Sequence, residues 1–315
     1  MERSKQYSTP YVFKGPLPLR QAIPLGLQHV LAMFVGNLTP ILIITNLCAA
    51  AGGAEDFAAI QVTLLQNAML VAGIVTLVQL FSVGPVGGQV PIIMGTSSGF
   101  IGVFQSVVSV MGGGIVSYGA IMGASILGGL FETVLGAFLK PLRRFFPAVV
   151  TGTVVLSIGL SLISVGVGSF GGGTSAKDYG SLENLLIALA VMVIVLALKH
   201  GAKGLASSSC ILIGIICGYV ICAILPMFLS TTGVTADGVE YTKAWVLNWD
   251  KVAQASWVSI PSILPVKPVF DLRAILPVMI MFIVTAVETV GDISGVTEGG
   301  MGREATDTEL SGGII

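Results

Sequence analysis

The stretch Ile275-Leu-Pro-Val-Met-Ile-Met-Phe-Ile-Val-Thr-Ala-Val-Glu-Thr-Val-Gly-Asp292 is apolar except for two carboxylates near its end, Glu288 and Asp292. Residues four apart lie on one face of a helix, one turn from each other. An ionisable side chain at the centre of a bilayer costs roughly 2.5–3.5 kcal/mol on insertion scales, so such groups usually face a polar cavity or a partner. The acidic pair therefore predicts a functional site at membrane depth.

The composition of the chain supports a membrane protein. Hydrophobic residues make up 54% and charged residues only 10% of its 315 residues, whereas soluble domains carry about 25% charged residues. Mean hydropathy is +0.94. The formal net charge of −1 argues against nucleic acid as a partner. The four cysteines form no CxxC pair and there are two histidines, so we expect no disulfide, no metal site and no cofactor.

Apolar runs of about 18 residues or more mark membrane spans. The stretch 84–111 differs, because it opens Gly84-Pro-Val-Gly-Gly-Gln-Val-Pro91, which a helix tolerates poorly. We predict a short extended piece and then a half-length helix starting near Thr96, since irregular backbone is tolerated at membrane depth only where it lines a cavity or is buried in protein. The sequence thus predicts an all-α polytopic membrane protein. Counting the broken segment as the third, the predicted spans are 22–47, 57–82, 84–111, 114–138, 146–168, 182–198, 205–229 and 270–293.

The basic residues favour a cytoplasmic N-terminus in the cell membrane. In that orientation Lys140, Arg143 and Arg144 lie on the cytoplasmic side. Most of the basic residues on the outer side belong to the long segment 230–269, and long loops count little when basic residues on the two sides of a membrane are compared.

The segment 230–269 is the one sizeable piece expected outside the membrane. It holds all three tryptophans of the chain, Trp245, Trp249 and Trp257. Because Trp is enriched at membrane–water interfaces, we expect an interfacial or amphipathic segment on the outer leaflet.

Polar side chains of the first span form a second group of candidates. Gln28 and His29 open the apolar run, and Asn37 and Thr39 follow at membrane depth. Gln and neutral His can hydrogen-bond either a polar planar ligand or a neighbouring helix. His29 fits both roles equally, whereas we expect Gln28 and Asn37 to give structural support.

The broken third segment forms a third group. A helix that begins near Thr96-Ser97-Ser98 would point its free N–H groups and the positive end of its dipole into the protein, where they suit a carbonyl oxygen or an anionic ring. The alternative is simple N-capping by these hydroxyls, a structural role that we assign to Thr96.

Each acid has alternative roles. Glu288 accepts hydrogen bonds when ionised and donates one when protonated, so it can bind the N–H edge of a heterocycle, carry a proton, or serve only as a structural carboxylate. Asp292 can tune Glu288, bind a coupling proton or cap its own helix. Glu132, in Gly128-Gly-Leu-Phe-Glu-Thr133, lies near the cytoplasmic end of its span, which favours a solvated or paired role over ligand contact.

Four motifs, in order along the whole chain, resemble those of the nucleobase–ascorbate transporter family, the xanthine/uracil permeases. They are Gln28-His29, Pro91-Ile-Ile-Met-Gly-Thr-Ser97, Phe146-Pro-Ala-Val-Val-Thr-Gly152 and Glu288-Thr-Val-Gly-Asp292.

The resemblance implies a 7+7 inverted-repeat transporter fold, present here in part, with a broken third helix that carries a short β-strand. The family's Asn-x-x-Gly region at the second broken helix would lie beyond Ile315, and residues 310–315 look like the start of another span. We therefore expect a truncated product that does not transport by itself. The implied parts are a cytoplasmic N-terminal segment 1–21, a core domain 22–139, a gate domain 140–229, an extracellular or interfacial loop 230–269, and the start of the second repeat 270–315.

The resemblance also implies proton symport by an elevator-like movement, usually in a homodimer, with a small-molecule base, a proton and the lipid bilayer as partners. An aspartate four residues after the span-eight glutamate is typical of the xanthine/urate branch and a histidine of the uracil branch, so Asp292 favours a purine. The family often stacks an aromatic directly after Gly-Thr-Ser, where this chain has Ser98. The implied substrate-binding residues are Glu288, His29, Ser97, Ser98 and Phe100, and the implied proton-coupling residues are Asp292 and Glu288.

Other readings stay open. A uracil permease of the same family is the main alternative, followed by a non-transporting fragment or membrane scaffold. An anion exchanger would want a cation at mid-span, and the predicted spans place none there. An intramembrane enzyme could pair His29 with Glu288, but nothing resembles a nucleophile motif, a metal cluster or a cofactor loop, so we expect no enzyme.

Overall fold

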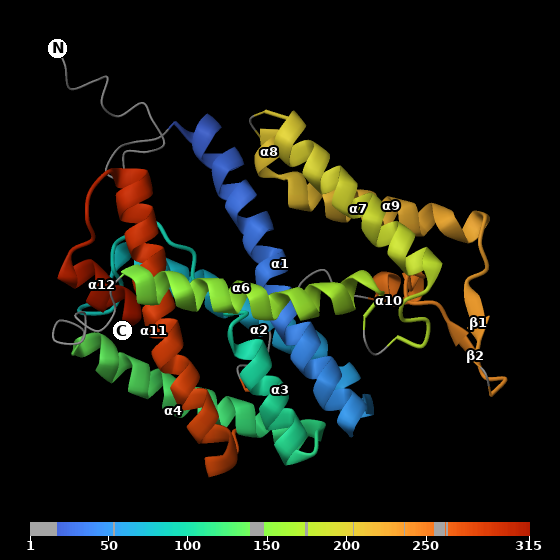
Figure 1. Cartoon of the computed structure of the whole chain (residues 1–315), viewed down its shortest axis with the longest axis horizontal. Coiled ribbons are helices and arrows are strands. Elements are labelled where there is room, and N and C mark those ends of the chain that lie inside the picture. Colours follow the sequence, from blue (N-terminus) through green and yellow to red (C-terminus); the bar gives the residue numbers. More distant parts are fainter. Residues whose placement is uncertain are drawn as a thin grey trace. The chain divides into compact units, whose positions relative to one another are not determined.

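The computed structural model describes residues 18–52, 54–138, 148–173, 176–203, 205–235, 237–254, 262 and 264–315, and most of these are helical (Figure 1). Five of the described helices are long and apolar enough to cross a membrane. The prediction of a polytopic, mostly helical membrane protein is therefore confirmed. The five are Ile60–Phe81, Gly114–Ala137, Leu182–Gly201, Cys210–Met227 and Leu272–Met301.

Contacts along the chain divide it into two compact units. The first comprises Met1–Ile23, Met33–Ser161 and Pro261–Ile315, and the second Pro24–Ala32 and Leu162–Ile260. The division into core and gate domains expected from the resemblance stays a prediction. The helices are α1 Leu19–Ala51, α2 Ala54–Phe81, α3 Phe100–Met111, α4 Gly114–Ala137, α6 Ala148–Phe170, α7 Leu182–Gly201, α8 Leu205–Ser208, α9 Cys210–Ile224, the 3-10 turn η2 Leu225–Met227, α10 Trp249–Gln254, α11 Leu272–Met301 and α12 Asp307–Ile314.

The predicted break in the third span is present, but its details differ. Helix α3 begins at Phe100 rather than near Thr96, because Ser98 and Gly99 form a turn first. The expected β-strand is absent from residues 84–98, where the structure has one isolated bridge, Val83 to Val86. Side chains of α1 and α2, and not a neighbouring strand, bind the extended backbone.

The core of the first unit forms where α11 packs on α4, α3 and α12 (Figure 1). Small residues of α4 allow close approach, as is usual for helices in lipid. A side-chain carbon at Gly123 would collide with the Val269 backbone, and one at Gly128 with the Phe282 ring. The Val269 N–H also donates to the Gly119 carbonyl at 2.8 Å, which fixes the chain just before α11.

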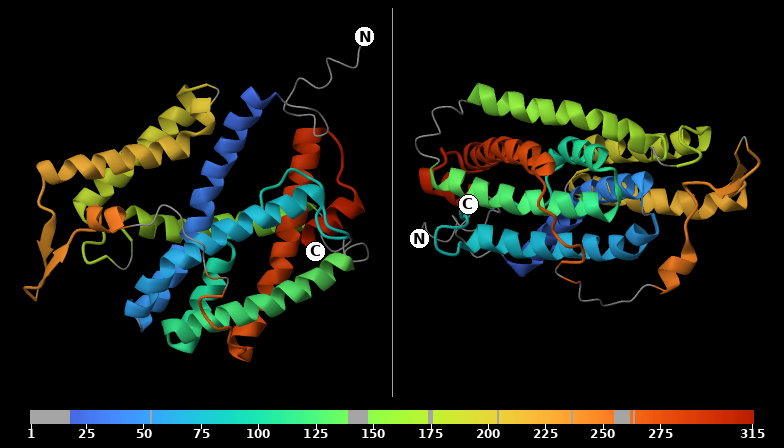
Figure 2. Two further views of the ribbon diagram at one scale, coloured as in Figure 1. Left: turned by 180° about the vertical axis from the view of Figure 1, so that it is seen from behind. Right: turned by 90° about the horizontal axis from the view of Figure 1, so that it is seen from below.

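The second unit is built on α7 and α9, which lie side by side in both views of Figure 2. Gly214 of α9 lets the Val195 side chain of α7 approach closely. Strands β1 Thr232–Val234 and β2 Glu240–Thr242 follow as an antiparallel hairpin.

The described residues around Ala244, in the segment 230–269, are held by specific contacts. Both carboxylate oxygens of the buried Asp178 accept from the Ala244 N–H, at 3.2 and 3.0 Å, and Lys243 pairs with Glu183 at 2.6 Å. Trp245 is 6% exposed, so this side chain is packed within the chain, and the place of the segment on the outer leaflet stays a prediction. Trp249 is 61% exposed, and Trp257 lies outside the described residues.

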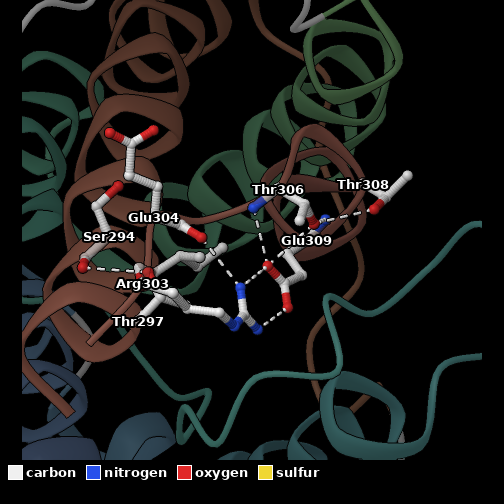
Figure 3. A network of polar contacts seen from close by, with 8 residues as sticks. Ser294, Thr297, Arg303, Glu304, Thr306, Thr308 and Glu309 are labelled. Atoms are coloured by element: carbon white, nitrogen blue, oxygen red, sulfur yellow. Dashed lines mark hydrogen bonds and ion pairs between the residues drawn. The ribbon is translucent and has the colours of Figure 1, made fainter. Parts of the chain in front are cut away.

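Helix α12 folds back onto the first unit. Its N-terminus has a capping box in which Thr306 and Glu309 bond each other's backbone N–H groups. Arg303 donates to both carboxylate oxygens of Glu309, at 2.9 and 2.5 Å (Figure 3). Further along, the Ser311 hydroxyl donates to the Gly136 carbonyl at 2.7 Å, and the Gly87 N–H donates to the Gly312 carbonyl at 2.6 Å.

We predict that Glu309→Gln speeds amide exchange in α12 at pH 6. The hydrogen bonds from Arg303 lower the pKa of Glu309 from 4.5 to about 2, so the folded turn is stabilised by the ionised form. That stabilisation is present above pH 4.5 and is lost as the pH falls toward 2. Hydrogen exchange by mass spectrometry should therefore show a difference between the two proteins at pH 6 that shrinks steadily below pH 4.5. A difference that is independent of pH would contradict the role of the charge.

Candidate functional site

A cavity of about 490 Å³ lies within the first unit, between the broken third segment and α11. Residues of α1, α2 and α4 complete its wall. Its volume falls within the roughly 300–1,000 Å³ typical of small-molecule sites. The polar residues that line it are Asn37, Gln79, Thr96, Ser97, Glu132, Thr285, Glu288, Thr289 and Asp292.

Helix α11 presents one polar face to this cavity. Thr285, Glu288, Thr289 and Asp292 recur at intervals of three and four residues, so a regular helix stacks them in one row. Glu288 is half-buried, whereas Asp292 is exposed. The predicted placement of both acids on one face is confirmed.

Ser97 joins the broken segment to α11. Its hydroxyl donates to Oε2 of Glu288 at 3.3 Å and accepts from the Gly99 N–H at 3.2 Å. The same hydroxyl thus caps the turn before α3 and orients the carboxylate. The capping role is present, and the role of Ser97 as a substrate-binding residue stays a prediction.

Asn37 anchors the broken segment to α1. This side chain is 3% exposed, and its Oδ1 accepts from the Thr96 N–H at 2.8 Å. The Thr96 hydroxyl donates back to Oδ1 at 3.2 Å. A side-chain carbon at Gly95 would collide with Asn37 Oδ1, so glycine is required for this approach. The contacts fit the structural support predicted for Asn37 and Thr96.

Helix α2 holds the other side of the segment. The Thr76 hydroxyl accepts from the Met94 N–H at 3.0 Å, and Oε1 of Gln79 accepts from the Gly88 N–H at 3.2 Å. The backbone carbonyl of Gln79 also accepts from the Gln89 N–H at 2.9 Å. These hydrogen bonds satisfy backbone N–H groups that have no partner in a helix or a sheet.

Aromatic rings separate the polar cavity from a second, mainly apolar one of about 530 Å³. Phe100 and Phe282 line both, and their ring centroids are 4.8 Å apart in an edge-on arrangement. Phe100 also stacks on Phe104 at 5.2 Å. Phe100 thus offers an aromatic surface to the polar cavity from a position two residues after Ser98.

Glu132 lies closer to the site than the sequence suggested. It lines the polar cavity, and its Oε1 accepts from the Thr285 hydroxyl at 3.1 Å. The expected paired role is present, and whether Glu132 also contacts a ligand stays a prediction. The position along α4 alone could not show that Thr285 of α11 meets it.

The remaining candidates are not among the described lining residues. Ser98 is part of the turn before α3 and is not among the described lining residues. His29 is exposed and belongs to the part of α1 assigned to the second unit. Gln28 has the same assignment, and its role as a brace stays a prediction. Sequence reasoning missed Gln79, although an amide within the apolar run of α2 was an available signal.

The charge of the cavity limits what it can bind. Its wall carries three carboxylates, and no lysine or arginine is among the described residues that line it. In the described part of the chain, no group of three or more His, Cys, Asp or Glu side chains is arranged to hold a metal ion. Carboxylates accept hydrogen bonds, so the arrangement suits a neutral or cationic ligand with N–H donors.

Comparison with known proteins places a chain of this architecture among the membrane permeases. A family model described as "Permease family", that of the xanthine/uracil permeases, matches residues 20–315. The chain therefore belongs to this family, whose members are transporters and not enzymes, as predicted.

Three relatives illustrate the match. A Clostridium perfringens protein named "Putative purine permease" is 38% identical over 289 residues, which is 91% of this chain and 57% of the relative. The uric acid permease PucK of Bacillus subtilis is 33% identical over 273 residues, covering 86% and 56%. The xanthine permease XanP of Escherichia coli is 29% identical over 318 residues, covering 95% and 61%. The chain spans just over half the length of these relatives.

We predict that Asn37→Ala destabilises the first unit by about 1–3 kcal/mol, because the Thr96 N–H loses its buried acceptor. Thermal unfolding in detergent measures the effect. The matched control is Asn46→Ala on the same helix, where the exposed amide oxygen accepts only from Gln61 at 3.1 Å. Equal shifts in Tm for the two variants would show that Asn37 is not a special anchor.

Proposed function

We propose that the protein takes up a purine nucleobase, xanthine or uric acid, across the cell membrane by proton symport. The observation that carries this proposal is the carboxylate of Glu288, oriented by Ser97 in the wall of a polar cavity at membrane depth. The printed names of the relatives, which include uric acid and xanthine permeases, support the same class of substrate.

The chemistry of the base fits this wall. Oxidised purines are planar and carry several ring N–H groups beside carbonyl oxygens. A carboxylate that binds an N–H donor forms a charge-assisted hydrogen bond, which is stronger than a neutral one. In the proposal Glu288 binds this edge of the base, and Phe100 offers a ring face against which the base can stack.

Proton coupling is assigned to Glu288 and Asp292. Both acids line one cavity, one helical turn apart, and a proton on either changes the charge that the other faces. We assign Asp292 to the coupling proton because it is the more exposed of the two. The elevator-like movement, the homodimer and the cytoplasmic N-terminus belong to the same proposal. His29 and Ser98 stay in it as further ligand contacts.

We predict that Glu288→Gln in the complete gene product lowers uptake of labelled xanthine at least tenfold. The amide keeps the size of the carboxylate but loses the charge, and hydrogen bonds to charged groups contribute about 1.5–3 kcal/mol. The variant should still reach the membrane in normal amounts, as measured by immunoblotting. Normal uptake by a well-expressed variant would refute the site assignment.

We predict that Asp292→Asn flattens the dependence of xanthine uptake on external pH, with a smaller loss at the pH of maximal uptake than Glu288→Gln shows. Asn cannot bind the proposed coupling proton. Asp292→His tests the alternative substrate, because a uracil-type site should gain uracil uptake relative to xanthine. An unchanged pH profile in Asp292→Asn would give Asp292 a structural role instead.

A further inference from the structure

Gln79 is an amide near the end of α2, 3% exposed, in the wall of the polar cavity. It lies far along the chain from the acids of α11, and nothing in the proposed function uses it. A buried polar side chain normally has a hydrogen-bond partner for each of its polar atoms, so a missing partner needs an explanation.

The orientation of this amide is fixed by its neighbours. The backbone N–H of Gly88 can only donate, and it meets the Gln79 side chain at 3.2 Å. The atom it meets must therefore be Oε1, and the NH₂ group occupies the other end. Rotating the amide by 180° would place the NH₂ group against the Gly88 N–H and break this hydrogen bond.

The NH₂ group has no partner among the described residues. Nε2 is buried, yet no hydrogen bond to it is present. Two glycines lie against it, since a side-chain carbon at Gly88 would come within 3.1 Å of Nε2 and one at Gly313 within 3.4 Å. A buried donor without an acceptor is costly, so a residue of this kind indicates an interaction that the free chain leaves unmade.

Several other side-chain donors of the cavity wall are already engaged. Ser97 donates to Glu288, and Thr285 donates to Glu132. The Thr96 hydroxyl and the Asn37 amide donate within the first unit, to Asn37 and to the sulfur of Met69. The three carboxylates are acceptors when ionised. A ligand that carries carbonyl oxygens as well as N–H groups needs donors, and the NH₂ group of Gln79 is one that no described residue uses.

We propose that Gln79 is a ligand-binding residue that donates from Nε2 to a carbonyl oxygen of the base and so selects oxidised purines over those without carbonyls. This rests on the proposed function, because it assigns the acceptor edge of the same ligand whose N–H edge Glu288 binds. Gly88 and Gln89 hold Gln79 through its Oε1 and its backbone carbonyl, which leaves Nε2 without a partner among the described residues.

The test compares purines that differ in their carbonyl groups. Xanthine carries two, hypoxanthine one and unsubstituted purine none. In the complete gene product, each is used to compete with labelled xanthine for uptake, which yields the ratio of apparent affinities for xanthine and purine. A site that bonds a substrate oxygen discriminates against an analogue lacking it, so this ratio reports the bond directly.

Two variants separate the donor from the structural contact. Gln79→Glu keeps an oxygen for the Gly88 N–H but replaces the NH₂ donor, and Gln79→Leu removes both. We expect the xanthine-to-purine ratio to fall by about 3- to 10-fold in Gln79→Leu, the effect of one hydrogen bond. In Gln79→Glu at neutral pH the ratio should fall further, because a carboxylate oxygen would face the carbonyl of the ligand.

The matched control is Gln61→Glu on the same helix. Its amide Nε2 already donates to Thr45 at 2.7 Å and to Asn46 at 3.1 Å, and Gln61 is outside the described cavity lining. This variant should leave the ratio unchanged.

The outcomes distinguish the two proposals. An unchanged ratio in both Gln79 variants, with Glu288→Gln still inactive, would overturn the role of Gln79 and leave the proposed function standing. A fall in transport rate without a change in ratio would likewise overturn it, since Nε2 would then bond another part of the protein. No uptake or competition by any purine in the wild type would overturn both.

Discussion

The need to satisfy backbone hydrogen bonds at membrane depth is the constraint on which the site depends. Segment 84–98 cannot be helical, because its prolines and glycines break the ladder, and the described residues supply no neighbouring strand for it. Side chains of the flanking helices take over this role. Asn37, Thr76 and Gln79 bond the N–H groups of Thr96, Met94 and Gly88. Helices α1 and α2 thereby hold the segment open as an extended wall.

The extended wall in turn sets the geometry of the acids. With residues 91–97 extended, Ser97 reaches Glu288 before the chain turns into α3. The later start of α3 places Phe100 in its first turn, where it meets Phe282 of α11. One irregular segment therefore orients both the carboxylate and the aromatic face of the cavity.

The sequence predicted the features that depend on local pattern. Hydropathy located the five described helices that are long and apolar enough to cross a membrane, the four-residue spacing placed Glu288 and Asp292 on one face, and the prolines and glycines located the break. It could not predict contacts that depend on distant helices. Thr285 meets Glu132 only because α11 crosses α4, and the Gln79 amide is oriented by Gly88. The burial of Trp245 likewise required the contacts of Asp178 and Lys243, which no period in the sequence encodes.

The hydrogen-bond pattern of the cavity links the proposed proton to the proposed ligand. Ser97 and Thr285 direct their hydroxyls onto carboxylates, so the wall formed by α3, α4 and α11 consists mainly of acceptors while Glu288 is ionised. A proton on Glu288 turns one of its oxygens into a donor, and the edge of a base that the site accepts changes with it. A ligand with both N–H and carbonyl groups responds to that change, whereas an apolar one does not. In the proposed function, a coupling proton on Asp292 would change the charge that Glu288 faces one helical turn away, so proton binding and recognition of the base would be linked within one cavity.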